Sequence, residues 1–391
     1  MTDQLIYDWN VQGAPQLRLP ETVGCLDETL AEGLRATSVV QPDLPACKAL
    51  IALARRVGFS SVNLGLADSR GVLERWDGGP AAVSVRSAAG LQSVLGSGIE
   101  EIRIHAPVSD LLLGGRRLSA AVDDLCRMIA QVGSRAVWVA EDATRTPPAT
   151  LSTALRAVHE AGARRVCLVD SAGTAMPLGV MRLLSWARQE APDMRWDWGG
   201  RNDRGLATVN ALAALSTGAD RVCGTALGLG EGPGVVALDT LLTNVALMRS
   251  PTVDLKILRD WCVAAAGHLG VSIPVNYPVL GEDAFRTATG VHAAAIVKAR
   301  KKGDVGLADR VYSGIPAGWF GLAQRIDIGP MSGLSNVSCW LEERSLHYTS
   351  EDVTRILQCA KQSNRTLSEE EVLQVLKESP PTPATRSETP A

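Results

Sequence analysis

The sequence predicts a (β/α)8 barrel followed by a smaller, mainly helical region. The first observation is an alternation of short apolar runs, rich in branched residues, with longer segments of helical periodicity, repeated eight times between about residues 22 and 247. The second is a glycine where a helical segment should end before the next strand, as at Gly133, Gly162 and Gly218. A doubly wound open sheet is the structural alternative, because it has the same alternation.

The predicted strands are short apolar runs bounded by charged or turn-forming residues. They are Val23–Leu30, Ser61–Leu66, Ala82–Arg86, Glu101–Ala106, Ala136–Glu141, Arg165–Asp170, Arg195–Gly199 and Arg221–Ala226. Between them, apolar residues recur at helical spacing, as in Leu151, Ala154, Leu155 and Val158. If the strands close into a barrel, the functional side chains should follow their carboxyl ends.

The remainder of the chain divides into regions of different composition. We expect an N-terminal segment at 1–21, the barrel at 22–250, helical subdomains at 251–378 and a disordered, Pro/Thr/Ser-rich tail at 379–391. An irregular stretch, 305–336, interrupts the helical region. The predicted helices of this region are Leu255–His268, Gly290–Lys301, Ser350–Ser363 and Ser368–Glu378. The last two begin with patterns close to Ser-x-x-Glu, which cap helix N-termini.

Composition excludes several classes of protein. Hydrophobic residues make up 46% and charged residues 21%, as in globular domains, and the net charge of −3 gives no reason to expect nucleic acid or an anionic membrane as partner. No signal peptide or membrane-length apolar run is visible, so we expect a cytoplasmic protein. The eight cysteines are scattered without a CxxC pair, which indicates reduced, mostly buried thiols.

Several strand ends carry motifs in the order found in a known enzyme family. The first strand runs into Asp27-Glu28-Thr29-Leu30-Ala31-Glu32-Gly33, and the fifth into Glu141-Asp142-Ala143-Thr144-Arg145. The sixth gives Asp170-Ser171-Ala172-Gly173, and the eighth Gly228-Leu229-Gly230-Glu231-Gly232. Over roughly residues 20 to 375, the chain resembles the isopropylmalate synthase and homocitrate synthase family of the DRE-TIM metallolyase superfamily, as a divergent member.

The resemblance continues past the barrel. The segment from Gly290 to Lys298, which contains His292, is similar to the linker subdomain of the synthases, where a histidine reaches into the partner's active site. Asp309-Arg310-Val311-Tyr312 also looks like synthase sequence. The resemblance implies aldol/Claisen-type carbon–carbon bond chemistry on a 2-oxo acid, with an acyl-CoA as co-substrate. It also implies a homodimer in which the linker regions are exchanged.

The family's metal centre is the part that this chain lacks. In the family the seventh strand ends in His-x-His-Asn-Asp, and its two histidines hold a divalent metal; Gly199 and Arg201 stand at those positions here. Glycine offers no ligand, and a guanidinium is a fixed cation that repels one. Other positions near the metal are changed as well, to Ala31, Glu32, Asn63 and Val235. We therefore predict that the protein holds no divalent metal.

Arg201 has two readings. In the functional one, its guanidinium replaces the metal cation, pairs with Glu32 and polarises a bound carbonyl or carboxylate. In the structural one, the same ion pair fills an empty metal site, since burying either charge alone would be costly. Asn202 and Asp203, which follow, suit the cap of the seventh helix.

Further candidates come from the strand ends and the linker. His292, Glu141 and Arg145 join Arg201 and Glu32 as predicted catalytic residues, with His292 as a proton carrier near neutral pH. The predicted substrate-binding residues are Arg35, His105, Asp170, Glu231, Asn63 and Tyr312. Each also has a structural alternative: a charge network for the charged residues, a hydrogen-bonded core histidine for His105 and a subunit contact for His292.

Two functions follow from this pattern. In the first, a divergent synthase-like enzyme acts on a 2-oxo acid or related carboxylate with chemistry that no longer uses a metal. In the second, a catalytically inactive relative serves as a structural or regulatory partner of an active paralogue or pathway protein. The remaining Glu141, Arg145 and His292 favour the enzyme, whereas the loss of the metal ligands favours the inactive relative.

Overall fold

The computed structural model describes residues 7, 9, 18–249 and 253–378, which form two compact units. One unit extends to Ser272 and holds the barrel; the other begins at Ile273. The predicted disordered tail, 379–391, lies outside the described residues, as does most of the predicted N-terminal segment. In the part of the chain that is described, no helix is long and apolar enough to cross a membrane.

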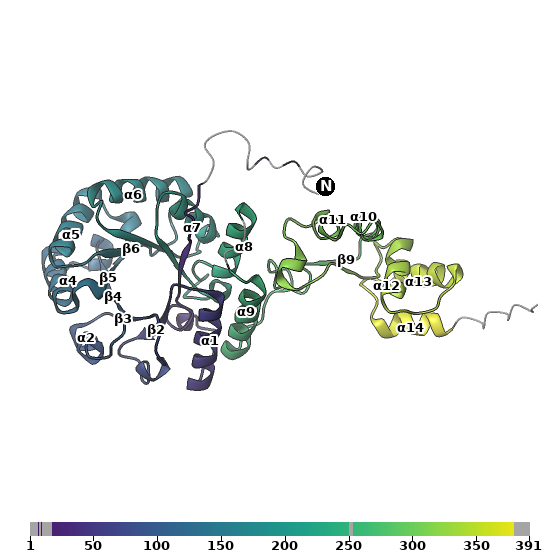
Figure 1. The fold of residues 1–391 in the computed structure, drawn as a ribbon, viewed down its shortest axis with the longest axis horizontal. Helices are drawn as coiled ribbons and strands as arrows, with labels where there is room; N and C mark the ends of the chain where they lie inside the picture. The colour runs from purple at the N-terminus through teal and green to yellow at the C-terminus, as the bar shows by residue number, and fades with distance from the viewer. Residues whose placement is uncertain (1–6, 8, 10–17, 250–252, 379–391) are drawn as a thin grey trace, which may run out of the picture. The chain divides into compact units, whose positions relative to one another are not determined.

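The first unit contains a closed barrel of eight parallel strands, as predicted (Figure 1). The strands are β1 (Gly24–Asp27), β2 (Ser61–Leu66), β3 (Ala81–Val85), β4 (Glu101–Pro107), β5 (Ala136–Glu141), β6 (Arg165–Asp170), β7 (Arg195–Gly200) and β8 (Arg221–Gly224). Pairing of β1 with β8, with Leu26 opposite Cys223, closes the barrel and excludes the open sheet. The first and last strands are shorter than expected, because the chain turns directly after Asp27 and Gly224.

Helices cover the outside of the barrel (Figure 1). They are α1 (Leu44–Val57), α2 (Ala88–Val94), α3 (Asp110–Leu113), α4 (Leu118–Val132), α5 (Pro148–Glu160), α6 (Pro177–Glu190), α7 (Ala207–Ser216), α8 (Leu238–Met248) and α9 (Leu255–Leu269), with 3-10 turns η3 (Gly33–Arg35), η4 (Leu73–Arg75), η5 (Gly133–Arg135), η6 (Ala143–Arg145) and η7 (Ala226–Gly228). Local sequence fixes their ends: the Asp43 carboxylate accepts the Ala46 N–H at 2.8 Å, and Gly58 ends α1 at φ 96°. Helix α9 packs against α1, within the barrel unit.

The barrel interior contains a thin apolar layer. Trp196 and Trp198 of β7 are buried and alternate with Asp197 and Gly199. Because successive strand residues face opposite sides of the sheet, the two tryptophans pack outward against helices, and Asp197 and Gly199 face inward. The apolar layer inside the barrel is made of Leu26, Ala82, Val137, Val139, Cys167 and Cys223, with Val169 beside them.

The second unit is helical, with one short pair of parallel strands. Its elements are α10 (Gly290–Lys301), α11 (Val305–Arg310), η8 (Ala317–Phe320), α12 (Leu334–Glu343), α13 (Ser350–Gln362), α14 (Glu369–Lys377), β9 (Arg286–Thr287) and β10 (Arg325–Ile326). The stretch expected to be irregular thus contains α11 and β10. The cap of α13 is Thr349, one residue earlier than predicted, in a capping box with Asp352, and Ser368 and Glu371 form the capping box of α14.

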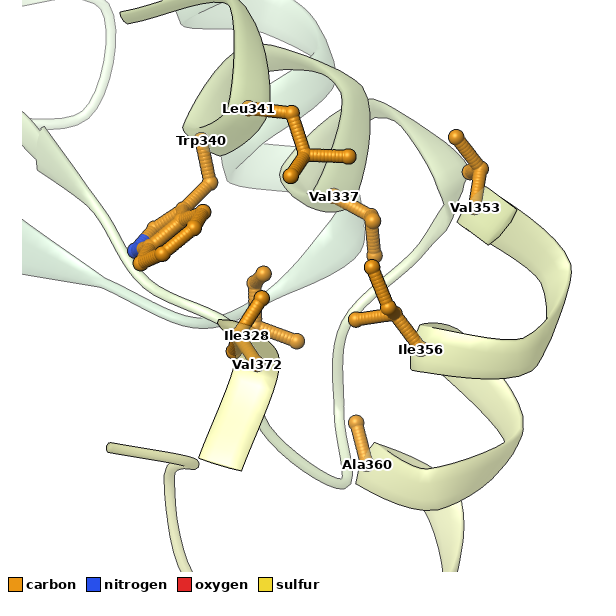
Figure 2. Close-up of a cluster of buried hydrophobic side chains, with 8 residues drawn as sticks. All are labelled: Ile328, Val337, Trp340, Leu341, Val353, Ile356, Ala360 and Val372. Atoms are coloured by element: carbon orange, nitrogen blue, oxygen red, sulfur yellow. The ribbon is translucent and has the colours of Figure 1, made fainter. Parts of the chain in front are cut away.

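The last three helices share one hydrophobic core (Figure 2). In Figure 2, Val337 and Leu341 of α12 point toward Val353 and Ile356 of α13, and Val372 of α14 lies beside Ile328. These buried side chains come from three helices and from the segment that holds Ile328. The second unit therefore has a core of its own.

Candidate functional site

A cavity of about 250 Å³ opens at the carboxyl ends of the barrel strands. The predicted residues Glu32, Arg35, His105, Glu141, Arg201 and Glu231 all line it. A neighbouring cavity of about 590 Å³ shares Glu32, Arg35, Arg86 and His105 with the first. Charged side chains from several strands therefore converge at this end of the barrel, as the strand-end rule predicts.

Arg35 joins two loops at the rim of the cavity. Its Nη1 lies 3.0 Å from a Glu32 carboxylate oxygen, and its Nη2 lies 2.9 Å from Glu231. Partial burial lowers the pKa of the guanidinium, but the two carboxylates outweigh burial and raise it above its usual value. Arg35 is therefore a permanent cation that links the loop after β1 to the loop after β8.

A second cluster of charges lies on β3, β4 and β5. Arg86 Nη2 is 2.8 Å from the Glu141 carboxylate, and His105 Nδ1 is 3.3 Å from the same oxygen. Burial raises the pKa of Glu141, but the hydrogen bond and charge of His105 and Arg86 outweigh it and lower the pKa to about 2. Glu141 is therefore an ionised carboxylate at any physiological pH.

Arg201 pairs with a different carboxylate from the one expected. Its Nε and Nη2 lie 3.0 and 3.1 Å from the two oxygens of Asp203, whereas Glu32 pairs with Arg35. The predicted Arg201–Glu32 pair is wrong, because each side chain pairs with an oppositely charged residue two or three positions away in the sequence. The N-cap of α7 is Leu206, so neither Asn202 nor Asp203 occupies the predicted cap position, although the Asn202 side-chain oxygen accepts the Ala207 N–H at 3.2 Å.

The side chains at the family's metal position do not fit a divalent metal. Gly199 has no donor atom, and a Cβ built on it would lie 3.7 Å from Cys167 Sγ. Val235 is apolar, and the Glu32 carboxylate is neutralised by Arg35. Within the described residues, no group of three or more His, Cys, Asp and Glu side chains is arranged to hold a metal ion. Absence of the metal from the working protein stays a prediction.

Three predicted residues support the site from outside the cavity. Asp170 is fully buried and accepts hydrogen bonds from Thr144 Oγ1 at 2.8 Å and Ala175 N at 3.0 Å. Arg145 Nε contacts Asp142 at 2.7 Å. Asn63 of β2 is fully buried, and its Nδ2 donates to Ser84 Oγ at 2.9 Å. These three order the loops and strands around the cavity rather than line it, and their predicted catalytic or binding roles stay predictions.

His292 and Tyr312 belong to the second unit. Their rings stack with centroids 3.8 Å apart and an angle of 27° between their planes. The contact joins α10 to the segment after α11. The predicted role of His292 as a proton carrier for the barrel stays a prediction.

The sequence reasoning missed Glu28 and Arg103, on the floor of the cavity. Arg103 is 1% exposed, and its Nε lies 3.3 Å from Glu28. Burial raises the pKa of Glu28 in spite of Arg103. A signal was available in β4, where Glu101, Arg103 and His105 alternate with Ile102 and Ile104, which puts the polar side chains on one face.

Arg103 also belongs to a second set of charges inside the barrel, which we call the buried charge cluster: Glu101, Arg103, Arg165, Asp197 and Arg221. Asp197 is at its centre, 2.6 Å from Arg165 and 2.5 Å from Arg221. Burial raises the pKa of Asp197, but the three arginines outweigh burial and lower it. The cluster ties β4, β6, β7 and β8 together inside the barrel.

Comparison with known proteins agrees with this geometry. Residues 82–262 match the HMGL-like family. The chain is 30% identical to a homocitrate synthase of Saccharolobus solfataricus over 303 residues, which is 72% of this chain and 63% of that enzyme's length. It is 27% identical to the homocitrate synthase of Sulfolobus acidocaldarius over 363 residues, covering 88% of this chain and 75% of that enzyme. The predicted resemblance is confirmed: the chain contains an HMGL-like domain and is related to the homocitrate synthases.

Solved structures share the fold at lower sequence identity. An HMG-CoA lyase from Pseudomonas aeruginosa aligns with a TM-score of 0.57 at 20% identity, over 65% of this chain and 95% of that one. The carboxyl transferase domain of Rhizobium etli pyruvate carboxylase, in a structure with pyruvate, aligns with a TM-score of 0.52 at 14% identity, over 94% of this chain and 70% of that one. Both similarities support the barrel.

Proposed function

We propose that the protein binds a 2-oxo acid or related carboxylate at the mouth of the barrel, with an acyl-CoA as co-substrate. It makes or breaks a carbon–carbon bond by aldol/Claisen-type chemistry without the divalent metal of its relatives. The observation that carries the proposal is the convergence of Arg35, Arg86 and Arg201 on one cavity in a homocitrate synthase-like barrel. Guanidinium groups bind carboxylates with two parallel hydrogen bonds and stabilise oxyanions.

Arg201 is the residue we assign to the position of the missing cation. Its side chain is 28% exposed and pairs with Asp203, which is 35% exposed. A pair this accessible to solvent is worth only ~0–1 kcal/mol, so a substrate carboxylate can replace Asp203 at little cost. A metal supplies several kcal/mol to such a reaction, and one guanidinium replaces only part of that. We therefore expect a changed reaction rather than a preserved one.

The same pairs are the observation that favours the second candidate, an inactive relative that serves as a structural or regulatory partner. Arg35, Arg86 and Arg201 each already have a carboxylate within 3.0 Å. A scaffold protein requires such pairs to neutralise charge, and it requires no ligand. The two candidates differ in whether the pairs open when a carboxylate is present.

We also propose that two copies of the chain form a homodimer in which the linker region of one protomer approaches the barrel of the other. The exposed ring of Tyr312, stacked on His292, is suited to such a contact. Light scattering of the full chain after size-exclusion chromatography should give twice the monomer mass. A monomer would contradict this part of the proposal.

The central experiment combines metal analysis with ligand binding. Purified protein should contain less than stoichiometric divalent metal, and a panel of 2-oxo acids and acyl-CoAs should raise its melting temperature. A ligand at about 100 times its Kd stabilises the fold by about 2.7 kcal/mol. Arg201→Ala should abolish the shift. Arg204→Ala is the matched control, because Arg204 bonds the Thr174 carbonyl at 2.9 Å and does not line the cavity.

The outcomes separate the candidates. A stoichiometric divalent metal in the purified protein would contradict the metal-free interpretation. A lack of response to every member of both panels would favour the inactive relative. If Arg201→Ala lowers the melting temperature without ligand and leaves the ligand-induced shift intact, the guanidinium stabilises the fold and does not bind the ligand.

A further inference from the structure

Three side chains at the barrel mouth are arranged as a nucleophile, a base and a carboxylate that positions the base. Ser84 Oγ lies 3.1 Å from His105 Nε2, and His105 Nδ1 lies 3.3 Å from the Glu141 carboxylate. The three come from consecutive strands, Ser84 from β3, His105 from β4 and Glu141 from β5. A hydroxyl next to one imidazole nitrogen, with a carboxylate on the other, is the arrangement that activates a serine.

The surrounding hydrogen bonds fix the direction of each proton. The Gly65 N–H donates to Asn63 Oδ1 at 3.2 Å, which orients the amide so that its Nδ2 donates to Ser84 Oγ at 2.9 Å. Since Asn63 already donates to it, the Ser84 hydroxyl keeps its own hydrogen for His105 Nε2. Every donor in the chain from Gly65 to His105 then has an acceptor.

The carboxylate fixes the other end of the imidazole. Glu141 is ionised and accepts from Arg86 at 2.8 Å, while Arg86 Nη2 also lies 3.4 Å from His105 Nδ1. The tautomer that serves the serine is the one in which Nδ1 carries the proton and donates it to Glu141. That tautomer leaves the lone pair of Nε2 directed at the serine. A negative charge next to Nδ1 also stabilises the imidazolium that forms when Nε2 takes a proton.

Ser84 is only 6% exposed, but it borders a cavity that a ligand could enter. Ser84 and His105 line the cavity of about 590 Å³, together with Arg70, Arg75 and Arg86. Arg70 is exposed at its rim. Arginines in this number give the cavity a positive lining, which favours an acyl compound that carries a carboxylate or phosphate group.

We infer that Ser84 is a nucleophile for acyl transfer, with His105 as its general base and Glu141 as the positioning residue. The substrate class is an anionic acyl thioester or ester. The inference rests on the proposed function only in this choice of acyl compound. The family resemblance placed His105 and Glu141 at a synthase site, but it gave no role to Ser84.

The covalent step balances as follows. Ser84 Oγ attacks the acyl carbon while His105 Nε2 takes the hydroxyl proton. The carbon–sulfur or carbon–oxygen bond breaks, and the leaving thiolate or alkoxide receives that proton from Nε2. Water then attacks the acyl-serine, its proton passes through Nε2 to Ser84 Oγ, and a free acid is released. The net reaction consumes one water and requires no oxidant or metal.

A small alkyl fluorophosphonate tests the nucleophile without any acyl-CoA or 2-oxo acid. Oγ attacks phosphorus and fluoride leaves, so the full-length protein should gain one phosphonyl group on the peptide that contains Ser84. Ser84→Ala should remove the adduct. Ser97→Ala is the control, since the Ser97 hydroxyl donates to the Val94 carbonyl in the loop before β4 and has no histidine partner.

The base and the positioning residue have their own readouts. His105→Gln should slow labelling by about 100-fold or more, the usual contribution of a general base. Glu141→Gln should slow labelling and change the dependence of its rate on pH, because the negative charge that stabilises the imidazolium next to Nδ1 is lost. A purely structural network would leave both the rate and its pH profile unchanged.

Two results would overturn the inference. One is a folded wild-type protein, verified by circular dichroism, in which Ser84 gains no adduct at millimolar probe. The other is an adduct that forms at the same rate in His105→Gln. Both can occur while 2-oxo acids still shift the melting temperature, so failure of this inference is separable from failure of the proposed function.

Discussion

The barrel contains two sets of arginine–carboxylate pairs that differ in their access to water. In the buried charge cluster, Asp197 is fully buried and Arg103 is 1% exposed. At the mouth, by contrast, Arg35 and Glu231 are 44% and 53% exposed. The distances overlap, since the nitrogen–oxygen distances are 2.5 to 3.6 Å in the buried charge cluster and 2.8 to 3.0 Å in the mouth pairs.

The difference in burial gives the two sets different properties. Removing one member of a buried pair leaves a charge that water cannot reach, at a cost of several kcal/mol. An exposed pair contributes ~0–1 kcal/mol, because water and salt replace the lost partner. The buried charge cluster therefore fixes the fold, whereas the mouth pairs can be exchanged for a ligand.

The largest predicted effect is in the buried charge cluster. Asp197→Asn keeps the shape of the side chain but removes the charge that Arg103, Arg165 and Arg221 share. We expect a loss of about 3–5 kcal/mol in the free energy of unfolding. Urea denaturation followed by circular dichroism measures it.

Asp203→Asn at the mouth is the matched control for this substitution. It removes the same charge from an Arg201 pair that is partly exposed, so the expected loss is under ~1 kcal/mol. Equal losses in the two variants would remove the distinction between the sets, and the mouth would then be part of the structural framework.

Most of the fold was predictable because it depends on local patterns. The strands Ser61–Leu66, Ala136–Glu141 and Arg165–Asp170 match the structure at both ends, since each is an apolar run between charged or turn residues. Closure of the barrel was a choice between two alternatives, because it depends on the pairing of β1 with β8, residues nearly 200 apart in sequence.

The site was predictable only where a family motif or a strand end marked it. Arg201 was found, but its partner was not, because Asp203 and Glu32 are equally plausible carboxylates until the side chains are placed. Ser84 was missed because a serine inside an apolar strand carries no signal by itself. Its relation to His105 arises from the pairing of β3 with β4, which a single sequence does not specify.

Asp27 provides the next test, since it is a buried carboxyl that lies outside both sets of ion pairs. Burial raises its pKa to about 6, although hydrogen bonds from Thr29 oppose the shift. Because the folded protein holds this proton more tightly than the unfolded chain does, the stability that it contributes is complete below pH ~4 and is lost as pH rises through about 6. The size is on the order of 3 kcal/mol.

Asp27→Asn should remove that dependence. Its amide oxygen can still accept from Thr29 N at the wild-type distance of 2.8 Å. Stability curves of wild type and variant, measured by urea denaturation between pH 4 and 7, should converge in acid and separate above it, with the variant more stable. Parallel curves would mean that the Asp27 carboxyl has the same pKa in the folded and the unfolded protein, and the inferred effect of burial would be wrong.

The smallest predicted effect is at the mouth, on the pair of Arg35 with Glu231. Glu231→Gln removes one of two carboxylates from the guanidinium, so stability should change by less than ~0.5 kcal/mol. An incoming carboxylate then no longer competes with Glu231, and its affinity should rise by roughly 1.5- to 5-fold, the equivalent of an exposed pair worth ~0.2–1 kcal/mol. Calorimetric titration with pyruvate measures the change, and added salt should reduce it because exposed charges are screened. The variant could instead lose several kcal/mol of stability and gain no affinity. The Arg35 pair would then contribute to stability as the buried charge cluster does, and exposure would not predict which pairs a ligand can open.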